Sequence, residues 1–166
     1  AIRLMMINLA PAAYTDDLEA KGAQLLASAM ANIACGNAKL GLNHAMAQPL
    51  GSYHIAHGLG VAVLLPYVMA FNLPACEEKM SRMAEILGLA NSSMSQSAKA
   101  KSVLIAVHDL YTKLNFPDRL SEEMVPKEKI PEMAKTVAGR PQMAFLRRKA
   151  SEKDIVAIYE RAYQGW

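Results

Sequence analysis

The sequence has few of the residues that build β-sheets. Aromatic residues make up 6% of its 166 residues, and no run of four or more β-branched residues occurs. Alanine is abundant and there are 11 methionines, and both residue types suit helices because they lose little side-chain freedom there. Apolar residues form 52% of the chain, which is typical of a globular protein. We therefore expect an all-α fold, a single helical domain over residues 1–166.

Features of secreted and membrane proteins are also missing. The two cysteines, Cys35 and Cys76, form no CxxC motif, and reduced thiols in a cytoplasmic protein are the simplest interpretation. No signal peptide is visible at the N-terminus. The most apolar stretch, residues 58–71, is shorter than a membrane span and contains Pro66. We expect a cytoplasmic location and no membrane partner.

A strong excess of one charge is absent as well. The formal net charge is +3, and 20% of the residues are charged. A basic cluster near the C-terminus lacks the aromatic interleaving or zinc-finger spacing of nucleic-acid-binding proteins, so we expect a solvated face and no nucleic-acid partner. The cluster consists of Arg140, Arg147, Arg148, Lys149 and Lys153.

What is present is a succession of helical patterns separated by proline and glycine. Pro66 should kink the apolar helix, and the last helix begins near Ser151, with Asp154 three residues later, as in a capping box. The expected helices cover residues 1–10, 15–37, 44–50, 57–72, 74–87, 95–115, 128–138 and 151–164.

The second of these helices is expected to be central and buried. Thr15 is the predicted N-cap, and the helix should end near residues 36–37. Leu25, Met30 and Ile33 alternate with alanine, glycine and serine, and such small residues allow a neighbouring helix to approach closely.

Three of the four histidines lie in one short segment, "NHAMAQPLGSYHIAHGLG". His44 and His57 are thirteen residues apart, on either side of a break at Pro49 and Gly51. The two imidazoles could converge on one metal ion if the break folds the second helix back beside the first. The segment could equally be a polar interruption between two buried helices, because this spacing alone is a weak signal.

The amino-acid sequence around the two histidines is a more specific signal than their spacing. The segment "GLNHAMAQPLGSYHIAHGLGVAVLLPYVMAFN" resembles the signature region of the iron-dependent (group III) alcohol dehydrogenases. The resemblance extends through "ASAMANIACGNAKLGLNHA", "KMSRMAEILG" and "ASEKDIVAIYERAY", and so covers nearly the whole chain. It implies that the chain corresponds to the all-helical C-terminal domain of that family.

The family resemblance also implies a metal site. In the family a dinucleotide-binding α/β domain precedes the helical one, and Fe²⁺ or Zn²⁺ lies in the cleft between them. Two of its four ligands map onto His44 and His57, and the other two, an Asp and a His, would precede residue 1. NAD(P) would bind through the domain that this chain lacks, since no Gly-rich phosphate loop is visible.

Two departures from the family pattern affect the expected substrate cleft. Many members have a second histidine four residues after the first ligand, whereas this chain has Gln48, which can hydrogen-bond a substrate but cannot titrate near neutrality. The segment from Pro49 to His57 is one residue shorter than usual. His54 would lie at the mouth of the cleft, so we take His54 and Gln48 as candidate catalytic residues.

Two functions therefore stand side by side. The first is part of a metal-dependent NAD(P)-linked oxidoreductase that interconverts a small alcohol and its aldehyde or ketone, with the metal polarising the substrate oxygen. The alternative is a catalytically incomplete helical interaction module derived from such an enzyme. In either case apolar surface left by the missing domain should lead to self-association as a homo-oligomer.

Overall fold

A computed structural model describes residues 1–121 and 124–166. Within these ranges it contains helices and no strand, which confirms the expected all-α fold. The α-helices are α1 (Ile2–Tyr14), α2 (Leu18–Ala38), α3 (Leu42–Ala47), α4 (His57–Ile86), α5 (Gln96–Lys113), α6 (Ile130–Ala138) and α7 (Glu152–Gln164). Three short 3₁₀ helices are η1 (Gln48–Tyr53), η2 (Lys127–Lys129) and η3 (Pro141–Phe145).

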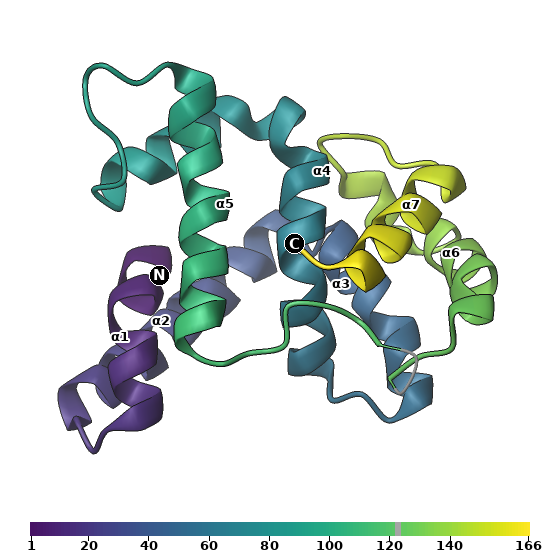
Figure 1. Cartoon of the computed structure of the whole chain (residues 1–166), viewed down its shortest axis with the longest axis horizontal. Coiled ribbons are helices and arrows are strands. Elements are labelled where there is room, and N and C mark those ends of the chain that lie inside the picture. The colour runs from purple at the N-terminus through teal and green to yellow at the C-terminus, as the bar shows by residue number, and fades with distance from the viewer. Residues whose placement is uncertain (122–123) are drawn as a thin grey trace.

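The 30-residue helix α4 forms the centre of the molecule, with α5 along one side and α3 and α7 against other parts of it (Figure 1). Val63 and Leu64 of α4 are fully buried in the larger core cluster, which joins α3, η1, α4, α6 and α7. A smaller cluster of Met80, Ala100 and Leu104 joins the second half of α4 to α5. The first half of α4 is thus held firmly next to α3.

The prediction of two separate helices over residues 57–72 and 74–87 was wrong, because α4 continues through both Pro66 and Pro74. A proline inside a helix leaves a carbonyl one turn earlier without its amide donor. The hydroxyl of Tyr111 donates to the carbonyl of Ala62, four residues before Pro66, at 2.7 Å. Arg148 similarly donates to the carbonyl of Phe71, three residues before Pro74. A side chain of another element thus compensates for the missing amide at Pro66.

By length and composition alone, helix α4 is long and apolar enough to cross a membrane, whereas the shorter apolar stretch predicted from the sequence is not. The core helices of globular proteins can be equally long and apolar. In this fold α4 buries Val63, Leu64, Tyr67 and Val68 against neighbouring helices.

The boundary between the first two helices differs from the prediction. Helix α1 continues past Pro11 to Tyr14, and Thr15 is its C-cap instead of the N-cap of the next helix. The Thr15 hydroxyl donates to the carbonyl of Pro11 at 2.8 Å and accepts the amide of Asp17 at 3.2 Å. Asp17 is the true N-cap of α2, since its carboxylate accepts the amide of Ala20 at 2.9 Å.

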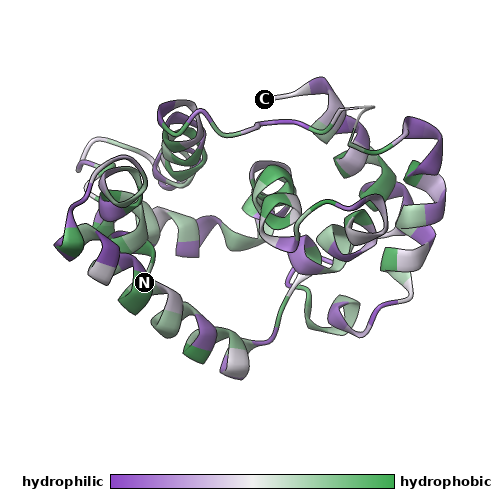
Figure 2. Cartoon of the chain, turned by 90° about the horizontal axis from the view of Figure 1, so that it is seen from below, coloured by the Kyte–Doolittle hydropathy of each residue, from purple (hydrophilic) through white to green (hydrophobic). Residues whose placement is uncertain are grey.

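Helix α2 is not the buried helix that its composition predicted. It packs chiefly against α1, and the side chains of Leu25 and Ile33 are 75% and 70% exposed. Figure 2 shows the helices near the N-terminus at the edge of the molecule, with hydrophobic positions along them. The apolar residues of α2 therefore form an uncovered face within this chain, defined by Leu18, Leu25, Leu26, Met30 and Ile33.

The predictions for the last three helices are confirmed to within a few residues. Ser95 caps α5 and accepts the amide of Ala98 at 3.2 Å. Ser151 and Asp154 form the expected capping box at the start of α7. Both caps satisfy amide groups that a helix start leaves without partners.

Tyrosine hydroxyls connect distant parts of this fold. Five of the six tyrosines donate to a backbone carbonyl far away in sequence, so the scarce aromatic residues join helices to one another and to loops. The donors and acceptors are Tyr14 to Leu114, Tyr67 to Asp118, Tyr111 to Ala62, Tyr159 to Met46 and Tyr163 to Val125.

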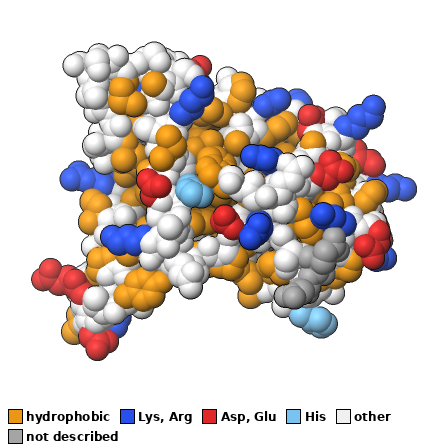
Figure 3. Space-filling model, viewed as in Figure 1, with side chains coloured by type: hydrophobic (Ala, Val, Ile, Leu, Met, Phe, Trp, Pro, Cys, Tyr) orange, Lys and Arg blue, Asp and Glu red, His pale blue; other side chains and the backbone are white. Residues whose placement is uncertain are grey.

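The basic cluster is only partly a solvated face. Arg147, Lys149 and Lys153 are exposed as expected, but Arg148 is half-buried, with its guanidinium 4.0 Å from the centre of the Phe71 ring. Arg140 is also half-buried. Over the face seen in Figure 3, basic and acidic side chains are interspersed.

Candidate metal centre

The histidine-bearing segment folds as a tight corner between two helices. His44 lies in α3, which begins at Leu42, two residues earlier than predicted, and His57 is the first residue of α4. Between them η1 buries Pro49 and Leu50, and His54 ends it in the left-handed region at φ 60°. This corner reverses the chain, so α3 and the start of α4 pack against each other.

The corner brings the two expected ligands together. The ring centroids of His44 and His57 are 5.4 Å apart and their planes are inclined by 54°. Two imidazoles that each place a nitrogen about 2.1 Å from one tetrahedral ion have centroids about 5 Å apart. The separation of the rings therefore fits a shared ion, even though the segment is one residue shorter than the family pattern.

The electrostatic setting of His44 suits a metal ligand. Its ring is half-buried, and burial, reinforced by the neighbouring His57, lowers the pKa of His44 below its ordinary value. A lower pKa favours the neutral imidazole, which is the form that coordinates metal ions. Burial therefore favours the coordinating form of His44 at neutral pH.

Asn43, which is not among the expected site residues, helps to position His44. Its side-chain amide donates to the carbonyl of Val61 in α4 at 2.9 Å, and so links α3 directly to the helix that begins at His57. Its Oδ1 atom is buried and has no hydrogen-bond partner among the described residues. Its place beside a candidate ligand was the one sequence signal that pointed to it.

Gln48 and His54 lie outside this pair. Gln48 is exposed directly after α3, and its backbone amide donates to the carbonyl of His44. His54 is exposed at the end of η1. The fourth histidine, His108, lies on α5, with its ring stacked on Trp166 at 5.9 Å.

The chain by itself provides only part of a ligand set. Among the described residues, no group of three or more His, Cys, Asp or Glu side chains is arranged to hold a metal ion. Two imidazoles fit a borderline divalent ion such as Fe²⁺ or Zn²⁺, whereas protein sites for these ions usually have three or four ligands. The two imidazoles thus correspond in number to half of such a ligand set.

Known proteins share this architecture. Residues 1–163 match the model of the Fe-containing alcohol dehydrogenase family, C-terminal part. The chain belongs to this family.

Two curated relatives illustrate the match. The sequence is 37% identical over 166 residues to 1,3-propanediol dehydrogenase from Klebsiella pneumoniae, covering 98% of this chain and 43% of that enzyme. It is 32% identical to lactaldehyde reductase from Escherichia coli, covering 89% of this chain and 39% of that enzyme. The chain thus spans less than half the length of these relatives.

A solved structure agrees with them. The crystal structure of a 1,3-propanediol oxidoreductase superimposes with a TM-score of 0.93 at 34% sequence identity, over 98% of this chain and 43% of that one. The predicted all-α fold and the predicted family membership are therefore both confirmed.

Proposed function

We propose that this chain is the metal-holding helical part of an iron-type alcohol dehydrogenase acting on a small alcohol, aldehyde or ketone. The observation that carries the proposal is the pairing of His44 and His57, at 5.4 Å between ring centroids, in a chain of this family. In this proposal residues 1–163 and the short C-terminal tail form one domain, and a dinucleotide-binding domain that binds NAD(P) is a separate part.

In this proposal the candidate site residues have the following roles. His44 and His57 would hold Fe²⁺ or Zn²⁺ as neutral imidazoles, with an Asp and a His from outside the chain completing the site. When bound, a metal ion held by these residues would supply Lewis-acid chemistry toward a substrate oxygen, and NAD(P) on the other domain would supply hydride transfer. Gln48 would hydrogen-bond the substrate hydroxyl, and His54 would contact substrate at the mouth of the cleft. Because the glutamine amide does not titrate, proton transfer would not pass through Gln48.

Metal titration of the purified chain tests the ligand pair. We expect Zn²⁺ or Co²⁺ to bind with one ion per chain, and H44A and H57A each to abolish that binding. H108A is the matched control, because His108 lies on another helix against Trp166, and it should bind as the parent chain does. Equal binding by H57A and H108A would contradict the assignment.

A chimera tests the catalytic part of the proposal. In this chimera the chain replaces the matching C-terminal portion of the Klebsiella pneumoniae 1,3-propanediol dehydrogenase. We expect NAD-linked alcohol oxidation that requires both His44 and His57. A folded chimera that binds metal but shows no such activity would favour the second candidate function.

That second candidate is an interaction module without activity of its own. The observation in its favour is the uncovered apolar face of α2, where Leu18 is 80% exposed and Leu25 75% exposed. Surface of this kind commonly marks a site of protein association. We propose that the isolated chain forms a homo-oligomer through it, in the cytoplasm, where Cys35 and Cys76 would remain free, reduced thiols.

A further inference from the structure

A large apolar cavity lies away from the histidine pair. It has a volume of about 530 Å³, is lined by α1, α2, α4 and α5, and is partly open to solvent. Its walls are almost entirely apolar, and methionines form much of them, including Met5, Met69 and Met83. A cavity of this size lies within the range of small-molecule sites, and methionine side chains adapt readily to an apolar ligand.

The cavity lining has few polar groups that could hydrogen-bond a polar ligand. The hydroxyl of Tyr111 reaches the cavity wall, but it already donates to the carbonyl of Ala62 at 2.7 Å. The lining therefore offers water and polar ligands few hydrogen-bond partners. The interior therefore selects for a hydrocarbon.

Next to the cavity, between α1 and the end of α4, a second pocket opens to solvent, and its surroundings are basic. Ile2 and Leu87 line both the cavity and the adjoining pocket, whose other lining residues include Arg3, Lys79 and Arg82. None of these three cations forms an ion pair with a described residue. The opening thus carries positive charge without a partner from the described chain.

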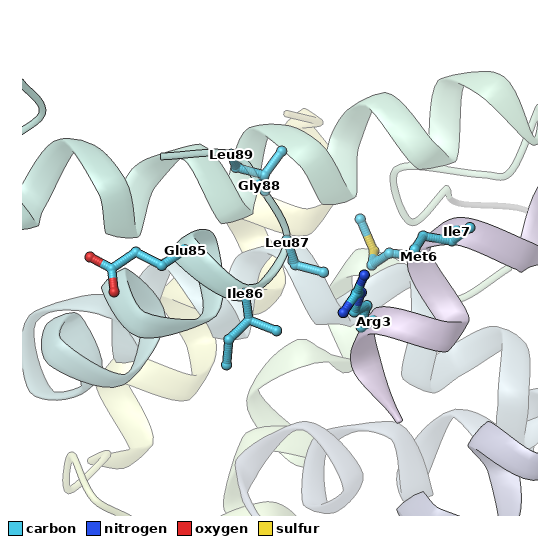
Figure 4. Close-up of a pocket in the computed structure, with 8 residues that line it drawn as sticks. All are labelled: Arg3, Met6, Ile7, Glu85, Ile86, Leu87, Gly88 and Leu89. Atoms are coloured by element: carbon cyan, nitrogen blue, oxygen red, sulfur yellow. The ribbon is translucent and has the colours of Figure 1, made fainter. Parts of the chain in front are cut away.

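Glu85, which lines a further pocket together with Arg3, does not neutralise this opening. Figure 4 shows Arg3 reaching from α1 toward Leu87, whereas the carboxylate of Glu85 points away to the other side. Glu85 is instead paired with Lys99 at 2.6 Å. The net effect at the opening is an attraction for anions.

We propose that this cavity binds a single-chain carboxylate, with its hydrocarbon tail between α1, α4 and α5 and its head group at Arg3, Lys79 and Arg82. An apolar interior joined to a basic rim matches an amphiphile with an anionic head. Neither the family nor the histidine pair assigns a ligand to this place, so the proposal is independent of the proposed function.

The test uses decanoate as the probe and the full chain, with binding followed by calorimetry. We expect one decanoate per chain. A62L fills the cavity and should weaken binding by about tenfold, because the added methyl groups displace methylenes of the ligand. A70L makes the same change on the same helix at an exposed position outside the cavity, and should bind as the parent chain does.

The thermal midpoint distinguishes a filled cavity from a damaged fold. A62L should keep or raise the thermal midpoint while it loses decanoate binding, and A31L, which fills the cavity from α2, should behave in the same way.

R3Q and R82Q test the basic rim. Each should weaken decanoate binding by about twofold to fivefold and leave decanol binding unchanged, with R147Q as an exposed control. Absence of saturable binding, or equal binding by A62L and A70L, would overturn the proposal. Equal affinity for decanol and decanoate would overturn the role of the basic rim.

Discussion

The hydroxyl of Tyr159 in α7 donates to the carbonyl of Met46 in α3 at 2.6 Å. Both residues are fully buried, so the last helix of the chain is joined to the helix that carries His44. Burial raises the pKa of Tyr159, which keeps the hydroxyl protonated as a donor. The position of the candidate ligand thus depends on a residue more than a hundred positions away in sequence.

We expect Y159F to lower the free energy of unfolding by about 1–3 kcal/mol, because the buried carbonyl of Met46 would lose its partner. Chemical denaturation followed by circular dichroism measures the change. Y53F is the control, since Tyr53 is half-buried and its hydroxyl forms no hydrogen bond with a described residue. A Y53F effect as large as that of Y159F would rule out this explanation.

Gly60 allows α4 to approach η1 closely, one turn after His57. A Cβ atom there would lie 3.1 Å from Cδ1 of Leu50, a fully buried side chain with little room to move. We expect G60A to cost about 1–3 kcal/mol through overpacking and to weaken metal binding by shifting His57 relative to His44.

Gly58 provides a matched control in the same helical turn. A Cβ atom at Gly58 meets nothing within 4 Å, so G58A should stabilise the chain by about 0.4–1 kcal/mol by restricting the unfolded state. Denaturation and metal titration of the two variants, side by side, measure both effects. The explanation fails if G60A is as stable as G58A and binds metal equally well.

The pKa of His44 should make stability depend on pH. Burial first and His57 second lower that pKa below 6.5 in the folded state, so the unfolded chain binds the proton more tightly. Stability from this source is complete at pH 7 and is lost as the pH falls through the folded pKa. We expect H44Q to flatten the decline in thermal midpoint between about pH 7 and pH 5. An unchanged decline in H44Q would contradict a lowered pKa of His44 in the folded state.

Local signals in the sequence predicted the C-terminal half of the fold well. Ser95 and Ser151 mark the starts of α5 and α7 because a hydroxyl that accepts a helix amide is a local interaction. The prolines of α4 misled the prediction. Tyr111, which compensates at Pro66, and Arg148, which binds the carbonyl of Phe71 near Pro74, both lie far away in sequence. Long-range hydrogen bonds of this kind leave no local pattern.

The candidate site was predicted unevenly for a similar reason. The resemblance of the sequence around His44 and His57 to the family predicted that these two residues would pair, and the fold places their rings together. The role of Asn43 was not predicted, because its amide finds Val61 only after the corner between α3 and α4 has formed. The predicted burial of α2 was wrong because an apolar pattern does not tell whether the covering partner belongs to the same chain.

The capping box of α7 gives a prediction independent of the metal site. Ser151 accepts the amide of Asp154 at 3.2 Å, and the carboxylate of Asp154 accepts the amide of Ser151 at 2.8 Å. We expect S151A to cost about 0.5–2 kcal/mol in chemical denaturation. S92A, in an exposed loop position before α5, should be neutral. Equal midpoints for the two variants would show that the cap contributes nothing.

The uncovered face of α2 leads to a prediction about association. Leu25 and Ile33 are eight residues apart on one helix and are 75% and 70% exposed, a pattern that usually faces another protein surface. We expect the chain to self-associate at high micromolar concentration, and the double variant L25N/I33N to shift it toward monomer in light scattering. The helix itself should survive, because Asp17 still caps it and the α1 contacts are untouched.

A matched control uses two exposed apolar residues elsewhere, Ile105 on α5 and Phe145 in η3. The variant I105N/F145N removes a similar amount of apolar surface outside α2, so it should leave the oligomer unchanged. If the parent chain is a monomer at these concentrations, or if both double variants dissociate it equally, then α2 is not the surface through which copies of this chain associate. A shift confined to L25N/I33N would place the contact on the helix that the sequence had predicted to be buried.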